Sequence, residues 1–206
     1  MSAAVGWLVA SYLLGAIPTS YLAGRLFRGI DLRAHGSRNL GATNLFRLLG
    51  WRFAVPVGLF DITKGAIPVL VFAPRVSDSQ LFALACGLAA VVGHVFSVFV
   101  RFRGGKGVAT AAGVMLGLTP AAIGVAALLW AILVFLTGYV SLGSIAAAAA
   151  FPVAVYLLEH PDRPEILWID AAVAAGIIWL HRANIRRLLN GTENRFGRRA
   201  AHAPRS

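Results

Sequence analysis

The sequence GGKG, Gly104–Gly107, places Lys106 among three glycines. The glycines allow the backbone to approach an anion, Lys106 supplies a positive charge, and a helix beginning at Val108 would add the positive end of its dipole. The stretch differs from a Walker A loop because Lys106 is followed by glycine rather than serine or threonine. A basic loop that orients a membrane protein is the simpler interpretation, but three glycines around one lysine exceed what orientation requires.

The first polar stretch along the chain, HGSRNLGATNLFR, runs from His35 to Arg47, and the glycine–lysine stretch is the second. Its hydroxyls, amides and backbone N–H groups near Gly41 can hydrogen-bond an anion, and Arg47 can bind a phosphate through two nitrogens at once. A helix starting near Thr43 would direct its N-terminal N–H groups at the same loop. Ordinary turn and capping chemistry accounts for the same composition, so this stretch alone leaves both interpretations open.

The third polar stretch, HRANIRRLLNGTE, begins at His181 and ends at Glu193. His181 closes an apolar run, and Asn184 and Arg187 follow at spacings that share one face of a helix. A single histidine at a membrane interface is more often an anchor or a helix cap than a catalytic group. The stretch therefore gains its meaning from the other two.

Long apolar runs separate these stretches. Hydrophobic residues make up 58% of the 206 residues and charged residues only 13%, with a formal net charge of +11. The cations lie in short connectors, so an anionic leaflet or substrate is a better partner than nucleic acid. No lysine or arginine precedes Arg25, which argues against a cleaved signal peptide. The single Cys86 lies in an apolar run and cannot form a disulfide within the chain.

We therefore predict an all-α polytopic membrane protein with a single domain over residues 1–206. A helix needs about 20 apolar residues to span the bilayer. Seven spans, the fourth of them short, are expected at Ala3–Ala23, Phe53–Phe72, Leu81–Val100, Val108–Leu118, Ala121–Thr137, Gly143–Leu158 and Ile166–Leu180. Thr119-Pro120 separates the fourth span from the fifth, because proline lacks the helix donor and restrains the residue before it.

The basic residues fix the predicted orientation. Sixteen of the 19 lysines and arginines fall in segments 24–52, 101–107 and 182–206, which lie on one side of the seven spans. Basic loops stay in the cytoplasm. We expect an external N-terminus, a cytoplasmic C-terminus and all three polar stretches on the cytoplasmic face. The basic tail from Arg195 to Ser206 is expected to dock on anionic lipid.

Two ionisable groups inside the second span, Asp61 and Lys64, are spaced i, i+3 and are expected to neutralise each other. Groups at such depth indicate either function or a structural ion pair. His94 in the third span precedes Arg101 by about two turns, near enough to support the glycine loop.

The residue patterns that the sequence lacks exclude several kinds of reaction. The sequence has eight acidic residues, and Asp78, Glu159, Asp162 and Glu165 fall on the outer side. The cytoplasmic face then lacks the clustered carboxylates that hard divalent cations prefer, so we expect no metal. No histidine is followed five residues later by aspartate, which excludes the His-x4-Asp pair of acyl-CoA-dependent glycerolipid acyltransferases. The site that remains suits phosphate.

In this order and spacing, GSRNLGATNLFR, FRGGKGVAT and HRANIRRLLNGTE closely resemble the motifs of the bacterial acyl-phosphate:glycerol-3-phosphate acyltransferase family. The resemblance covers nearly the whole chain. It implies transfer of a fatty acyl group from acyl phosphate to the 1-hydroxyl of sn-glycerol 3-phosphate, giving lysophosphatidic acid and phosphate. It places this first acylation of phospholipid synthesis at the cytoplasmic face of the inner membrane. No cofactor, nucleic acid or obligate protein partner is implied; membrane lipid surrounds the enzyme.

The matched positions carry the expected roles. Activity is expected from Ser37, Arg47, His181 and Asn184. Substrate contacts are expected from Asn39, Gly41, Thr43, Asn44, Gly104, Gly105, Lys106, Gly107, Thr110 and Arg187, with acyl phosphate at the glycine loop. Structural support is expected from Asp61, Lys64, His94 and Glu193.

The base that accepts the hydroxyl proton has two candidates, His181 and a phosphate oxygen of the substrate. The second is favoured because no carboxylate on this face is placed to orient His181. Two other functions compete. An anion transporter would need a matching polar path on the outer side, and a membrane phosphatase or phosphotransferase would need metal ligands.

Overall fold

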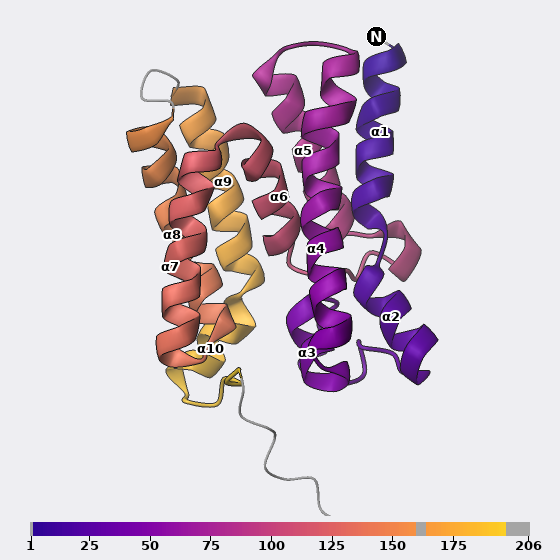
Figure 1. Ribbon diagram of the computed structural model, residues 1–206, viewed down its shortest axis with the longest axis vertical. Coiled ribbons are helices and arrows are strands. Elements are labelled where there is room, and N and C mark those ends of the chain that lie inside the picture. The colour runs from indigo at the N-terminus through magenta and orange to yellow at the C-terminus, as the bar shows by residue number, and fades with distance from the viewer. Residues whose placement is uncertain (1, 160–163, 197–206) are drawn as a thin grey trace, which may run out of the picture. The chain divides into compact units, whose positions relative to one another are not determined.

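The computed structural model describes residues 2–159 and 164–196, which are helical or irregular throughout (Figure 1). The chain forms two compact units, Met1–Ile123 and Gly124–Ser206. The part of the predicted tail beyond Phe196 and the connector 160–163 lie outside the described residues.

The first unit contains the first two polar stretches. Its helices are α1 (Ser2–Ala16), α2 (Thr19–Arg28), α3 (Ala42–Leu49), α4 (Trp51–Ile67), α5 (Gln80–Val95) and α6 (Val108–Leu118), with α7 (Pro120–Thr137) beginning at its end. Shorter turns extend α4 through Pro68–Phe72 and Ala73–Arg75, and a 3-10 turn at Val98–Val100 follows α5.

The first predicted span, Ala3–Ala23, lies within the helical segment Ala3–Arg28, but a break near Pro18 divides that segment. Helix α1 ends at Ala16, and α2 starts at Thr19. Pro18 has no N–H to donate, and a residue before proline, here Ile17, is disfavoured in helical conformation. The break turns α2 away from α1 (Figure 1). The third predicted span, Leu81–Val100, lies within the segment Gln80–Val100, in which α5 ends at Val95 and the 3-10 turn Val98–Val100 follows.

Close helix packing in the first unit depends on small residues. Helix α1 packs along α5, and α4 along α6. A Cβ added at Gly15 of α1 would overlap backbone atoms of Ala90 in α5, and one added at Gly113 of α6 would overlap the carbonyl of Ile62 in α4. Small residues allow helix backbones in membranes to approach in this way. The helix pairs therefore form a rigid frame for the loops at their ends.

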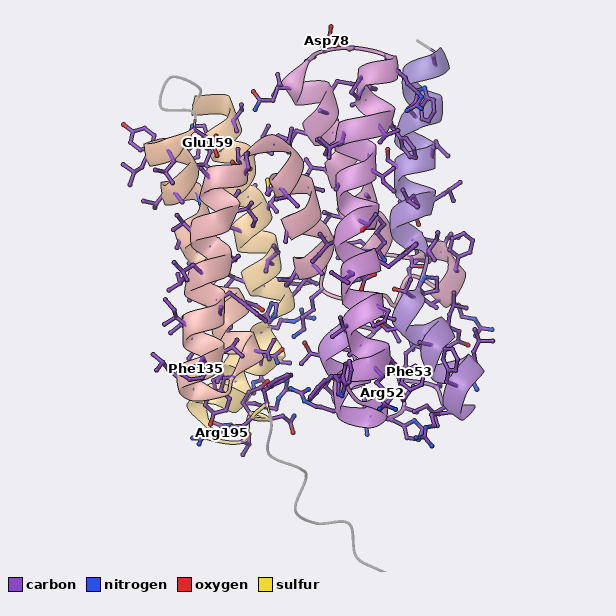
Figure 2. All side chains as sticks on the ribbon, in the orientation of Figure 1. Arg52, Phe53, Asp78, Phe135, Glu159 and Arg195 are labelled. Carbon is purple, nitrogen blue, oxygen red and sulfur yellow. The ribbon has the colours of Figure 1, made fainter. Side chains whose placement is uncertain are left out.

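The second unit contains most of α7, then α8 (Val140–Leu158), α9 (Pro164–Leu180) and α10 (Arg182–Leu189). Helix α8 packs against α9, and both contact α10. Trp130 of α7 donates a hydrogen bond from Nε1 to Ser144 Oγ of α8 over 3.3 Å. In Figure 2, Glu159 marks one end of this unit and Arg195 the other.

Among residues 2–159 and 164–196, five helical segments are long and apolar enough to cross a membrane: Ala3–Arg28, Trp51–Arg75, Gln80–Val100, Pro120–Thr137 and Val140–Leu158. A sixth candidate is the pair formed by Ile166–Leu180 and α10, which bends by 57°, and α6 is a shorter apolar helix. Large apolar side chains cover the exposed surface of these segments; Phe135, for example, is 88% exposed. Such a surface suits lipid rather than water.

Within the first unit, the α4–α5 connector at Asp78 and the segment around Arg52 lie at opposite ends (Figure 2). Near the Asp78 end, Arg75 lies over the ring of Trp7, 5.3 Å from its centroid. At the opposite end, Arg52 lies over the ring of Trp51, 5.8 Å from its centroid. Arginine–aromatic pairs are typical of membrane–water interfaces. Arg52 and Arg75 thus lie at the two ends of the apolar segment Trp51–Arg75.

Candidate active site

The first polar stretch folds around Asn44. The side chain of Asn44 is 1% exposed. Its Nδ2 donates to the carbonyls of His35 and Asn39, both over 3.1 Å, and its Oδ1 accepts from the Ser37 N–H over 2.9 Å. These bonds lie within the stretch itself, so Asn44 shapes the loop that carries the half-buried Ser37 and Asn39.

The backbone of this loop is tightly turned. Gly36 has a φ of 59°, and a Cβ there would overlap Asn44 Oδ1, which favours glycine. Arg38 has a φ of 60°, a conformation uncommon outside glycine. Helix α3 follows, with Gly41 as its N-cap residue and Thr43 in its first turn. Arg47 lies in its last turn and is half-buried.

The glycine loop is tied to the end of α5. The N–H of Gly104 donates to the Val95 carbonyl over 3.0 Å, and that of Gly105 to the His94 carbonyl over 3.1 Å. Gly107, with a φ of 78°, is the N-cap residue of α6, and no side chain caps this helix end. The N-terminal N–H groups of α6 therefore border the loop that carries the half-buried Lys106, an arrangement suited to an anion.

Thr110 stands in the first turn of α6. Its side chain is fully buried, and its Oγ1 has no hydrogen-bond partner among the described residues. A buried hydroxyl of this kind is uncommon and points to a ligand or water that the protein binds.

The two loops are in contact. Ser20 of α2 donates from Oγ to the Leu40 carbonyl over 3.2 Å, at a buried position. A Cβ added at Gly105 would lie 3.0 Å from the same carbonyl oxygen and would overlap His94 Nε2. The first two polar stretches, more than sixty residues apart in the sequence, thus meet at Leu40 and Gly105.

A salt bridge that the sequence analysis missed adds a second connection between the stretches. Arg33 pairs with Asp31 through Nη2 and Oδ2 at 2.7 Å, and its Nη1 donates to the Val100 carbonyl over 3.3 Å. The Arg33 hydrogen bonds lower the pKa of Asp31 from 3.8 to about 2, despite an opposing contribution from burial. The pair holds the start of the first stretch against the turn that precedes the glycine loop.

A buried ionic cluster connects α4 with α2 and α5. Lys64 Nζ is 2.7 Å from Asp61 Oδ1, which is the ion pair that the i, i+3 spacing predicts. Asp61 Oδ1 also accepts from Thr19 Oγ1 over 2.8 Å, and His94 Nδ1 lies 3.8 Å from it. Lys64 Nζ donates to the carbonyl of Ile17 over 2.9 Å. The pair therefore contacts both sides of the break between α1 and α2.

The third stretch is organised in the second unit by Glu193, which is 7% exposed. Glu193 accepts from Asn184 Nδ2 over 2.8 Å, from Arg187 Nε over 2.6 Å and from Ser141 Oγ over 3.0 Å. Ser141, in the first turn of α8, has no signal in the sequence that would connect it to this stretch.

His181 is the N-cap residue of α10 and is 3% exposed. Its Nδ1 lies 2.8 Å from the Ile177 carbonyl, an acceptor only, so Nδ1 carries the proton of this hydrogen bond. In the neutral ring, Nε2 then has a lone pair and accepts. The sequence offers no carboxylate to orient the His181 ring. In the structure, the backbone carbonyl of Ile177, one helical turn earlier, orients it instead.

The apolar spans define an integral membrane protein. Its glycine–lysine loop at a helix N-terminus and its arginine-bearing polar loop have the chemistry that suits an anion. In the described residues, no three His, Cys, Asp or Glu side chains gather as a metal site. The model of the family described as "Glycerol-3-phosphate acyltransferase" matches residues 5–191. The chain belongs to this family, which makes it an acyltransferase of the membrane.

Curated relatives and solved structures agree. A glycerol-3-phosphate acyltransferase of Trichlorobacter lovleyi is 45% identical over 196 residues, which are 95% of this chain and 99% of the relative. That of Chlorobaculum parvum is 42% identical, covering 94% and 97%. A crystal structure of PlsY, an integral membrane glycerol 3-phosphate acyltransferase in its glycerol 3-phosphate form, has a TM-score of 0.87 and 39% identity, covering 94% and 96%. A lysophosphatidic acid form of PlsY has a TM-score of 0.83 and 38% identity.

Proposed function

We propose that this acyltransferase transfers a fatty acyl group from acyl phosphate to the 1-hydroxyl of sn-glycerol 3-phosphate, giving lysophosphatidic acid and phosphate. The observation that carries the proposal is the contact between the glycine loop and the first polar loop at Leu40 and Gly105. Both loops suit phosphate, and the reaction has two phosphorylated substrates. Solved relatives in glycerol 3-phosphate and lysophosphatidic acid forms support the acceptor and the product.

The two substrates repel each other, and the cations offset this repulsion. Arg47 binds one phosphate through its planar guanidinium, and Lys106 binds the other beside the glycine backbone and the N-terminus of α6. Thr110 adds a hydroxyl at the same helix end. Ser37 and Asn39, on the loop shaped by Asn44, complete the polar surface. Holding both substrates in one orientation supplies much of the rate acceleration.

Acyl phosphate needs no protein nucleophile, because phosphate is already a good leaving group. The 1-hydroxyl oxygen attacks the acyl carbon, the acyl carbon–oxygen bond to phosphate breaks, and the hydroxyl proton passes to a base. Backbone N–H groups of the glycine loop are suited to stabilise the charge that develops on the acyl oxygen. The acyl chain remains among lipids while its phosphate head enters the site.

We assign the base to a phosphate oxygen of the substrate, with His181 and Asn184 orienting glycerol 3-phosphate. His181 Nε2 can accept a hydrogen bond, but its Nδ1 partner is the neutral carbonyl of Ile177. A neutral carbonyl stabilises an imidazolium less than the carboxylate of a catalytic triad does. Asn184 is held by its hydrogen bond to Glu193, which also accepts a hydrogen bond from Arg187.

The proposal extends to topology and location. The chain has seven spans, with α6 as the short one and α9 as the last, an external N-terminus and a cytoplasmic C-terminus, as the distribution of cations predicts. All three polar stretches act from the cytoplasmic face of the inner membrane, on one catalytic domain without an obligate protein partner.

The deciding experiment presents the purified protein with glycerol 3-phosphate and either acyl phosphate or acyl-CoA, in the presence of a chelator. We expect lysophosphatidic acid from acyl phosphate only. Product from acyl-CoA alone would overturn the donor assignment, and no product from either donor would overturn the function.

The base is tested separately by His181→Asn. A substantial residual rate with an unchanged pH–rate profile supports the substrate phosphate as base. Loss of most of the rate, together with loss of the fall in kcat at acidic pH, would instead make His181 the base.

A further inference from the structure

The buried Asp61–Lys64 pair has contacts that an ion pair for stability alone would not need. Both residues are 1% exposed. Removing two charges from water costs about as much as their attraction returns, so apolar replacements of a buried pair are often neutral or stabilising. Stability alone therefore does not explain the pair, and its other contacts become informative.

One set of contacts leads from Asp61 to the first polar loop. Asp61 Oδ1 accepts from Thr19 Oγ1 over 2.8 Å, at the start of α2. The next residue, Ser20, donates to the Leu40 carbonyl over 3.2 Å. Lys64 holds the other side of the break through the Ile17 carbonyl at 2.9 Å. The position of Leu40 thus depends on where the ion pair holds the start of α2.

A second set leads from Asp61 to the glycine loop. His94 Nδ1 lies 3.8 Å from Asp61 Oδ1, and the other side of the ring, at Nε2, lies against Gly105. The backbone of His94 reinforces this arrangement, because its carbonyl accepts from the Gly105 N–H. Gly105 in turn packs on the Leu40 carbonyl. The contacts therefore form a closed ring that starts at Asp61 in α4, passes through α2, the first polar loop, the glycine loop and His94 of α5, and returns to Asp61.

We propose that Asp61 and Lys64 are positioning residues for the acyl transfer, fixing the separation of the two substrate-binding loops through Thr19–Ser20 and His94. This inference rests on the proposed function of those loops. In such a ring, a small shift of either loop changes the distance between two bound substrates. A displacement of about 1 Å can cost roughly a hundredfold in rate.

The test uses the neutral pair Asp61→Asn/Lys64→Met, which leaves no unpaired buried charge, together with Thr19→Val. The matched control is Thr63→Val, which removes an exposed hydroxyl of the same helix that donates only to the Leu59 carbonyl. Measurements are the apparent melting temperature, and kcat and KM for both substrates. Thr63→Val should match the unmodified protein.

We expect the neutral pair to melt within a few degrees of the unmodified protein, yet to lose roughly tenfold to a hundredfold in kcat/KM. Thr19→Val should change the same constants in the same direction, and adding it to the neutral pair should change little more, since coupled sites are not additive. Normal kinetics in the neutral pair, or a fully additive effect of Thr19→Val, would overturn the proposal.

If the neutral pair does not fold, Thr19→Val and Ser20→Ala decide, because both leave the charges in place. Unchanged kinetics in both variants would overturn the inference, and a shared loss of kcat/KM would support it. Failure of the unmodified protein to transfer acyl groups would instead contradict the proposed function, so the two failures are distinguishable.

Discussion

Glu193 accepts a hydrogen bond from Ser141, 52 residues earlier in the chain, over 3.0 Å. The bond joins the segment after α10 to the first turn of α8. The same carboxylate holds Asn184 and Arg187. The carboxylate of Glu193 is therefore the main group that holds the third polar stretch in place.

Glu193→Ala is expected to destabilise the protein by about 2–4 kcal/mol, because it leaves the buried donors of Ser141 and Asn184 without their acceptor. Glu193→Gln retains the shape and should lose less. The neighbouring, exposed Thr192→Ala is the control. Thermal unfolding in detergent provides the measurement, and equal melting temperatures for all three variants would contradict the assignment.

Gly104→Ala and Gly105→Ala are expected to abolish most acyl transfer. The added methyl at Gly104 would overlap the His94 carbonyl, a backbone atom that cannot rotate away, and the one at Gly105 would overlap the His94 ring. Either change displaces the loop that carries Lys106. Gly6→Ala, in open space on α1, should leave the rate unchanged. Wild-type KM values in the two loop variants would show that the loop does not bind substrate.

Arg47→Ala and Lys106→Ala are each expected to reduce kcat/KM roughly a hundredfold or more, as for the loss of one preorganised donor at a reacting charge. Arg52→Ala provides a matched control, since Arg52 is exposed and lies over the ring of Trp51. Steady-state kinetics with each substrate varied gives the answer. Normal kinetics in both site variants would remove these cations from the site.

Stability should depend on pH through Asp31. Its pKa is lowered from 3.8 to about 2, so its ion pair with Arg33 stabilises the fold fully above pH 3.8 and loses this effect as the pH falls toward about 2. Asp31→Asn should be less stable above this window and should lose less stability within it. Apparent melting temperatures across the window test this; parallel pH profiles for both proteins would contradict it.

Orientation can be tested with single cysteines in a Cys86→Ser background and a thiol reagent that does not cross the membrane. Cysteines at Arg103 and Asn190, both exposed, should react from the cytoplasmic side only. A cysteine at Asp78, at the opposite end of the first unit from Arg52, should react from outside (Figure 2). Labelling of Arg103 and Asn190 from opposite sides would refute a shared face for the glycine loop and the third stretch.

The sequence predicted helix positions well where local signals exist. Helix α6 occupies Val108–Leu118 as predicted, because Gly107 and Pro120 mark its ends. The break at Pro18 was missed since it interrupts neither the apolar run nor the charge pattern. Pro18 is one residue in a run of about 20 mostly apolar residues, and such a run favours a continuous span.

The site was predictable in composition but not in its connections. The three polar stretches are visible as residue types, and the pairing of Asp61 with Lys64 follows from helical spacing. The contacts of Ser20 with Leu40 and of Ser141 with Glu193 join distant parts of the chain. Such contacts arise from helix packing, which residue spacing alone does not encode.

The hydrogen bonds that tie Gly104 and Gly105 to the end of α5 also affect the thermodynamics of ligand binding. A glycine-rich segment has a large conformational entropy when free, and here that entropy is lost during folding. An arriving phosphate therefore finds backbone donors already arranged, and its affinity is not reduced by the ordering of a flexible loop.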